Sequence, residues 1–117
     1  MLPKPYRLPG SALAAVFKSK NIIQAPTLSL KFIQTKTKTS RLGFIVSPKT
    51  ARLAVDRNRL KRQLRHAVCP LLPQLKSNHD ILLFAKKSLV KQTFTSIQAV
   101  VKTALHKAKL LNEKRSS

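Results

Sequence analysis

The charge of this chain constrains its fold and its partners more than any other feature. Its 117 residues hold 24 Lys and Arg against three acidic residues, a formal net charge of +21. Charges so unbalanced repel one another unless an anionic partner neutralises them, which makes a polyphosphate the expected partner. A basic membrane-surface protein is the alternative. That class needs an amphipathic helix with aromatic anchors, and the chain has no Trp and one Tyr.

Length and composition predict one small domain spanning residues 1–117. With 43% hydrophobic residues, the chain can form one core but is too short for two. The prolines among residues 1–9 predict an extended basic arm, and we expect residues 112–117 to form a flexible tail. The lone Cys69 excludes an internal disulfide and is compatible with a reducing compartment. We expect a cytoplasmic protein, because the sequence shows neither a signal peptide nor a membrane-spanning segment.

The acidic residues and the histidines argue against a catalytic site on the protein itself. Metal-dependent hydrolysis of a phosphodiester needs several clustered carboxylates. The acidic residues are instead far apart in the sequence: Asp56, Asp80 and Glu113. The histidines show no metal-ligand spacing: His66, His79 and His106. We therefore expect no catalytic residue and no metal ligand on this chain, and a two-histidine acid–base nuclease is a remote alternative.

The first half of the chain predicts a short helix and two strands. Ser11 can cap a helix whose apolar residues share one face: Leu13, Val16 and Phe17. Residues 21–26 are expected to form a connection.

Residues 27–34 and 41–47 alternate in the manner of strands with one face on a core. In the second of these, the apolar residues on one side are Leu42, Phe44 and Val46. The polar stretch 35–40 is expected to be a hairpin loop between the two strands.

The second half predicts a long helix, a central strand and a last helix. Asp56 is a suitable N-cap, and apolar residues then fall in one arc of the helical wheel: Leu60, Leu64, Ala67, Val68 and Leu71. Pro70 and Pro73 either end this helix or kink it. Residues 81–85 form a continuous apolar run typical of a central strand, and a helix is expected from Thr93 to about Leu111. The order is α-β-β-α-β-α, an α+β sandwich in a single domain.

The helix after Asp56 carries the strongest indication of function. The helix carries a polar residue and five cations: Arg57, Asn58, Arg59, Lys61, Arg62 and Arg65. All of these except Arg57 lie opposite its apolar arc. A solvated charged face is the simpler interpretation. However, no acidic residue four positions away neutralises these cations, and most of them are Arg, whose planar fork pairs with phosphate. We predict that this face binds nucleic acid, and RNA in preference to DNA, because no helix-turn-helix, zipper or zinc-finger pattern accompanies it.

At this point the sequence resembles the protein subunit of bacterial ribonuclease P, over about residues 7–110. The helix segment RNRLKRQLR at 57–65 matches the family's RNR signature. Val46-Ser47 with Lys49 after it, and the stretch DILLFAKK at 80–87, match the strands on either side. An opening Arg7-Leu8 followed by Val16-Phe17 also fits.

The resemblance implies the fold of the second domain of ribosomal protein S5, with the RNR helix in a left-handed βαβ crossover, against the usual right-handed rule. It also implies a role. The RNA subunit and its Mg²⁺ ions cleave the 5′ leader from precursor tRNA, and the protein binds both RNAs with no obligate protein partner. The leader-binding residues implied on the sheet and beside it are Leu13, Phe17, Lys31, Phe44, Lys86 and Lys87.

This chain departs from the family pattern at two of these positions. Leu13 stands where an aromatic residue is common, and Lys31 stands where a Tyr is often found, so charge is expected to replace part of the stacking. Two other interpretations remain. A small ribosomal or ribosome-associated protein that binds ribosomal RNA would be equally basic, and a free-standing nuclease is disfavoured by the missing carboxylates.

Overall fold

The most apolar segment of the chain forms the middle of the sheet. In the computed structural model, which describes residues 4–111, β4 (His79–Ala85) lies between β2 (Leu28–Gln34) and β3 (Arg41–Ile45). β4 pairs antiparallel with β2 and parallel with β3. Because both neighbours and both faces of β4 are covered, its side chains are almost all buried, as its unbroken apolar run predicted.

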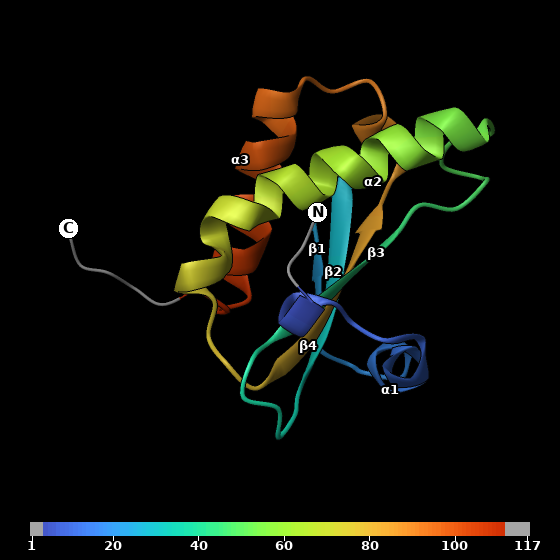
Figure 1. Cartoon of the computed structure of the whole chain (residues 1–117). Coiled ribbons are helices and arrows are strands. Elements are labelled where there is room, and N and C mark those ends of the chain that lie inside the picture. Colours follow the sequence, from blue (N-terminus) through green and yellow to red (C-terminus); the bar gives the residue numbers. More distant parts are fainter. Residues whose placement is uncertain (1–3, 112–117) are drawn as a thin grey trace.

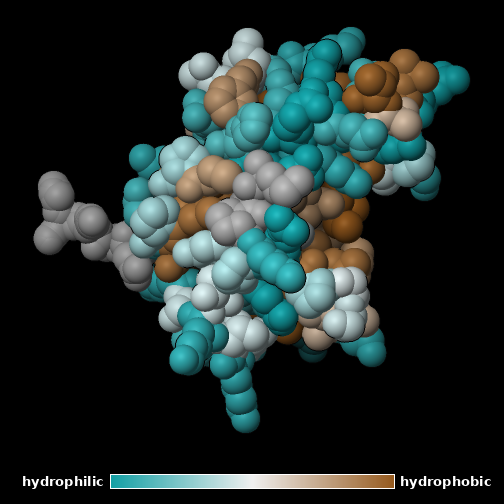
Figure 2. All heavy atoms as spheres, in the orientation of Figure 1, coloured by the Kyte–Doolittle hydropathy of each residue, from teal (hydrophilic) through white to brown (hydrophobic). Residues whose placement is uncertain are grey.

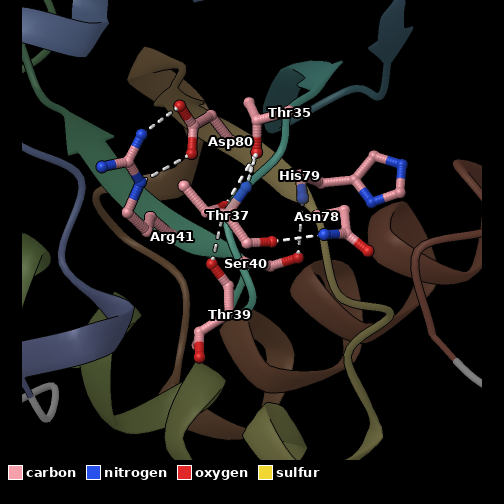
Figure 3. A network of polar contacts seen from close by, with 8 residues as sticks. All are labelled: Thr35, Thr37, Thr39, Ser40, Arg41, Asn78, His79 and Asp80. Carbon is pink, nitrogen blue, oxygen red and sulfur yellow. Dashed lines mark hydrogen bonds and ion pairs between the residues drawn. The ribbon is translucent and has the colours of Figure 1, made fainter.

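The central position of β4 overturns the hairpin expected at residues 35–40. β2 and β3 do not pair with each other, since β4 lies between them in the order β1-β2-β4-β3. The stretch 35–40 therefore crosses the end of β4 and is bound to the turn before that strand (Figure 3). The backbone N–H of Thr35 donates to the carbonyl of Asn78 at 2.6 Å, and Ser40 Oγ accepts from the N–H of His79 at 3.1 Å.

The connection expected at residues 21–26 is wrong, because it contains a strand. β1 (Ile22–Gln24) pairs antiparallel with β2 and forms one edge of the sheet. Three residues are too few to show an alternation, and the strand exists because β2 offers it a free edge.

The helices α2 (Ala54–Val68) and α3 (Phe94–Lys107) pack together on one face of the sheet (Figure 1). The apolar arc predicted for α2 is confirmed, with these residues buried: Leu60, Leu64, Ala67 and Val68. Asp56 is not the N-cap. Leu53 takes that position, and Asp56 lies in the first turn, where its charge still favours the helix N-terminus. The helix ends at Val68, and Pro70 falls in a 3-10 turn (Cys69–Gln74) that keeps the apolar stripe buried.

The last helix is close to the prediction. Thr93 caps α3, its hydroxyl accepting from the N–H of Ser96. The inward residues Ile97, Val101 and Leu105 are fully buried. The helix ends about four residues before Leu111, because Lys109 turns the backbone into the left-handed region with φ 60°.

The other face of the sheet carries the short helix α1 (Leu13–Phe17). Val16 of α1 and Leu82 of β4 are fully buried but lie outside the main core cluster, as expected for a second, smaller core. Ser11 does not cap this helix, because it lies inside a preceding 3-10 turn (Gly10–Ala12).

The N-terminal segment is only partly an extended arm. Lys4–Tyr6 form a 3-10 turn, and Arg7 then bridges to Leu42 in parallel, with the N–H of Leu8 donating to the Leu42 carbonyl at 3.0 Å. Gly43 permits this close approach, since a Cβ there would come within 3.2 Å of the Leu8 side chain. The arm's first three residues and the tail expected at 112–117 lie outside the described residues.

One ion pair joins the two parallel strands. Asp80 is 2% exposed, and its two oxygens accept hydrogen bonds from Arg41 Nε at 2.9 Å and Nη2 at 2.7 Å (Figure 3). The hydrogen bond to Asp80 raises the pKa of the Arg41 guanidinium above its ordinary value. The two-pronged pair therefore fixes the start of β3 against the start of β4.

Candidate nucleic-acid interface

The outward face of α2 presents the predicted cations to solvent. Burial of Leu60 and Leu64 turns the opposite arc outward. Arg59, Arg62 and Asn58 are exposed, and Lys61 and Arg65 are partly buried. Figure 2 shows hydrophilic atoms gathered over α2 in the upper part of the view.

Five residues of this helix make no hydrogen bond or ion pair with another side chain or carbonyl within residues 4–111. They are Asn58, Arg59, Lys61, Arg62 and Arg65, and we refer to them as the α2 basic face. Their donors are free for an external acceptor. Uncompensated like charges on one helix oppose its formation, so the sequence tolerates a cost here that an anionic partner would remove.

Arg57, the sixth predicted residue, is engaged within the protein. Its Nη1 donates to the carbonyls of Ala51 at 3.0 Å and Arg52 at 2.9 Å. The guanidinium thereby holds the loop that precedes α2 against the first turn of the helix. We therefore assign Arg57 a positioning role and leave it outside the α2 basic face.

An open hollow of about 770 Å³ lies at the start of α2. Its lining includes three cations from different segments, Lys49, Arg52 and Lys87, together with Asp56 and the apolar side chain of Leu53. Lys87 was predicted as a leader-binding residue, and the structure places it here, beside the helix. Lys49 and Arg52 were not predicted as site residues. The acid-free loop that feeds the basic helix was the signal that could have indicated them.

A second surface lies on the sheet beside α1. Residues paired across strands share a face, so Gln24, Ser29 and Phe84 form one row across β1, β2 and β4. The ring of Phe17 in α1 contacts that of Phe84 edge to face, with centroids 5.6 Å apart, and Phe17 remains 44% exposed. We call this surface the α1 face of the sheet.

Besides Phe17, three of the predicted leader residues lie on or beside the α1 face. Lys31 Nζ donates to the carbonyl of Phe17 at 2.9 Å, which places a cation next to the exposed ring. Lys86 follows β4 two residues after Phe84, and its Nζ donates to the carbonyl of Ala25 at 2.7 Å. Leu13 lies at the other end of α1 and is partly buried.

Phe44 lies on the opposite face of the sheet. It pairs with Leu83 and packs against the main core beneath the helices. Phe44 is two residues after the buried Leu42, so both side chains point to the same face of the sheet. Phe17 contacts the opposite face. The geometry brings Phe17, Lys31 and Lys86 to the α1 face but places neither Phe44 nor Lys87 among them.

The two acidic side chains within residues 4–111 do not fit a magnesium site. Asp56 lies on α2, and Asp80 is buried on β4 in its ion pair with Arg41. Within residues 4–111, no three His, Cys, Asp or Glu side chains come together as metal ligands. In the same part of the chain, no helix is long and apolar enough to cross a membrane.

Comparison with known proteins identifies close sequence relatives. A family model described as Ribonuclease P matches residues 2–109. A ribonuclease P protein component of a Synechococcus species is 34% identical over 116 residues, covering 95% of this chain and 87% of that protein. One from a Pseudanabaena species is 36% identical over 114 residues, covering 96% and 98%.

Solved structures agree with the sequence comparison. The RNase P protein of Staphylococcus aureus superposes with a TM-score of 0.81 at 25% identity, covering 99% of both chains. The RNase P protein of Thermotoga maritima gives a TM-score of 0.78 at 24% identity, over 86% of this chain and 96% of that one. At that identity the second likeness shows the fold alone.

Proposed function

Because the chain belongs to the ribonuclease P family, the protein components of a tRNA-processing endoribonuclease, we propose that it binds the catalytic RNA of that enzyme through the α2 basic face. The single observation that carries this proposal is the set of five polar and cationic side chains on one helix that have no partner within the described residues. Arg forks suit phosphate oxygens, and backbone phosphates supply the missing negative charge. The ribosomal alternative is set aside, since the relatives are ribonuclease P proteins.

We further propose that the α1 face binds the single-stranded 5′ leader of precursor tRNA. The half-exposed Phe17 ring, braced edge to face by Phe84, offers a base a stacking surface. Lys31, fixed beside it by its bond to the Phe17 carbonyl, is positioned to meet a phosphate. The hollow lined by Lys49, Arg52 and Lys87 is a further cationic surface, at the start of α2, for the RNA backbone.

The protein contributes binding and charge neutralisation in this scheme, and the bond cleavage belongs to the RNA. Mg²⁺ would supply Lewis-acid catalysis and would be held by RNA oxygens, because the two described carboxylates of the protein do not fit it. The roles of the chain's own residues are to bind the RNA subunit, to stack and orient the leader, and to lower the repulsion between the two RNAs.

The purified protein alone is expected not to cleave precursor tRNA. Asp80 is occupied by Arg41, and Asp56 is the only other carboxylate within residues 4–111, so this part of the chain offers no free pair of carboxylates to hold catalytic cations. Precursor tRNA incubated with RNA-free protein and Mg²⁺ and separated on a gel checks this. Cleavage that is abolished by a chelator and persists after nuclease treatment of the protein would contradict it.

Affinity for the RNA subunit is expected to fall steeply with salt. If the α2 basic face and the cations beside it neutralise about six phosphates, the slope of log affinity against log salt is about −4 to −5. Filter binding between low and moderate salt measures the slope. A slope near −1 would mean that most of the charge lies outside the interface.

A capture experiment tests the partner itself. The tagged protein is recovered from cells of its source, and the bound RNA is sequenced. We expect one abundant noncoding RNA with the features of the ribonuclease P RNA, together with precursor tRNA. Enrichment of ribosomal RNA instead would favour the alternative that was set aside.

A further inference from the structure

One side chain at the edge of the α1 face is held in a fixed orientation. Gln24 ends β1 opposite Ser29 and is exposed. Its Oε1 accepts hydrogen bonds from Ser29 Oγ at 3.0 Å and from Lys86 Nζ at 3.1 Å. Lys86 is itself fixed by its second bond, to the carbonyl of Ala25 at 2.7 Å.

The chemistry of lysine decides which way this amide points. An ammonium group donates and cannot accept, so the atom of Gln24 that faces Lys86 must be the amide oxygen. The NH₂ group therefore points away from Lys86, and no described residue accepts a hydrogen bond from it. Lys86 Nζ has three donors and uses two of them. The groups that Gln24 and Lys86 leave free at this edge of the α1 face are therefore donors.

The position of Gln24 places these donors next to the stacking surface. Gln24, Ser29 and Phe84 form one row across three adjacent strands, and Phe84 supports the ring of Phe17. Gln24 is two strands from Phe84, about 10 Å at ordinary strand spacing. A single strand that stacks one base on Phe17 thus has a neighbouring base within reach of Gln24.

We propose that Gln24 and Lys86 read a guanine in the leader. A glutamine with a free oxygen and a free NH₂ pairs with adenine, which offers an acceptor and a donor side by side. Here the oxygen is occupied, so of the two purines only guanine fits, because its Hoogsteen edge presents two acceptors, O6 and N7. Adenine would set its N6 amino group against the donors of Gln24. This inference rests on the proposed leader binding.

The test compares substrates that differ in one leader base. Holoenzyme reconstituted with its own RNA subunit is titrated with precursor tRNAs carrying guanine or adenine at each leader position in turn, and with tRNA lacking the leader. We expect guanine to bind about five- to tenfold more tightly than adenine at one position, the effect of one hydrogen bond and one unpaired donor. Replacing that guanine with 7-deazaguanine is expected to remove part of the preference.

Variants at Gln24 separate base reading from general binding. Q24E keeps an oxygen for Ser29 and Lys86 but turns the outward donor into an acceptor, so the preference is expected to invert in favour of adenine. Q24A is expected to bind both bases equally. Gln34→Glu, at the far end of β2, adds the same charge outside this edge and is the matched control, with the guanine preference unchanged.

Two failures have different meanings. If wild-type holoenzyme binds tRNA equally well with and without the leader, the proposed leader site is wrong, and the base reading fails with it. If the leader strengthens binding and F17A reduces that gain, but no position prefers guanine or Q24E keeps the wild-type ratio, then leader binding stands and the assignment of Gln24 is overturned.

Discussion

Replacing Arg59 and Arg62 together with alanine is expected to abolish assembly with the RNA subunit at protein concentrations that suffice for the wild type. Both side chains are exposed and make no contact with a described acceptor. Each charge-assisted contact to phosphate contributes about 1.5–3 kcal/mol, so the two losses weaken affinity by at least about 100-fold. The fold should be kept, because alanine favours helices and two repelling charges are removed.

The measurement pairs thermal melting with binding to the RNA subunit. A matched control removes two exposed lysines from α3, as Lys102→Ala with Lys107→Ala, and so changes the net charge equally on another helix. We expect the α3 variant to bind nearly as well as the wild type. If the R59A/R62A protein unfolds, these arginines stabilise the fold. If it assembles normally at limiting concentration, they do not take part in binding the RNA subunit.

Arg41→Ala is expected to lower the free energy of unfolding by about 3 kcal/mol. The substitution leaves the Asp80 carboxylate, which is 2% exposed, without its two hydrogen bonds. An unpaired buried charge costs several kcal/mol, and the partial exposure of Arg41 keeps the estimate at the low end of that range. Thermal melting checks it, with a drop of about 10–15 °C for a domain of this size.

The double variant Arg41→Leu with Asp80→Leu is the informative control. Removing both charges abolishes the desolvation penalty, so this protein should regain most of the stability that Arg41→Ala loses. If Arg41→Ala has the same melting temperature as the wild type, the ion pair does not stabilise the junction between β3 and β4. If the double variant is as unstable as the single one, the loss comes from packing rather than from charge.

The sequence predicts the local elements well where their periodicity is long. Leu60, Leu64 and Val68 recur at helical spacing over about two turns, and the structure buries all three. The run at 81–85 has no polar residue, so a strand covered on both faces was the natural expectation. The prediction of RNA binding came from the same helix, because no acidic residue lies four positions from the cations opposite its apolar arc.

What the sequence does not predict depends on distant segments. Nothing local to β2 and β3 indicates that a strand some forty residues further along the chain will separate them, and so the 35–40 hairpin was wrong. β1 exists only because β2 has a free edge. Arg57 looks like its neighbours in the sequence, and only the folded loop brings the carbonyls of Ala51 and Arg52 to its guanidinium.

Phe44 and Gln24 illustrate the same limit on the sheet. The alternation with Leu42 already placed Phe44 on the core side, and the family resemblance alone made it a leader residue. Nothing in the sequence marked Gln24 as a site residue. The orientation of its amide is fixed by Lys86, which is 62 residues away in the chain.

The most direct measurement of the central claim is cleavage of precursor tRNA by the RNA subunit at limiting protein, with leaders of increasing length. We expect the protein to raise kcat/KM, and to raise it more strongly as the leader lengthens over the first few nucleotides. F17A should lose the leader-dependent part of this increase, and R59A/R62A should lose the whole increase. A rate that is the same with and without the protein, or a gain that does not depend on the leader, would contradict the assignment of α2 to the RNA subunit or of the α1 face to the leader.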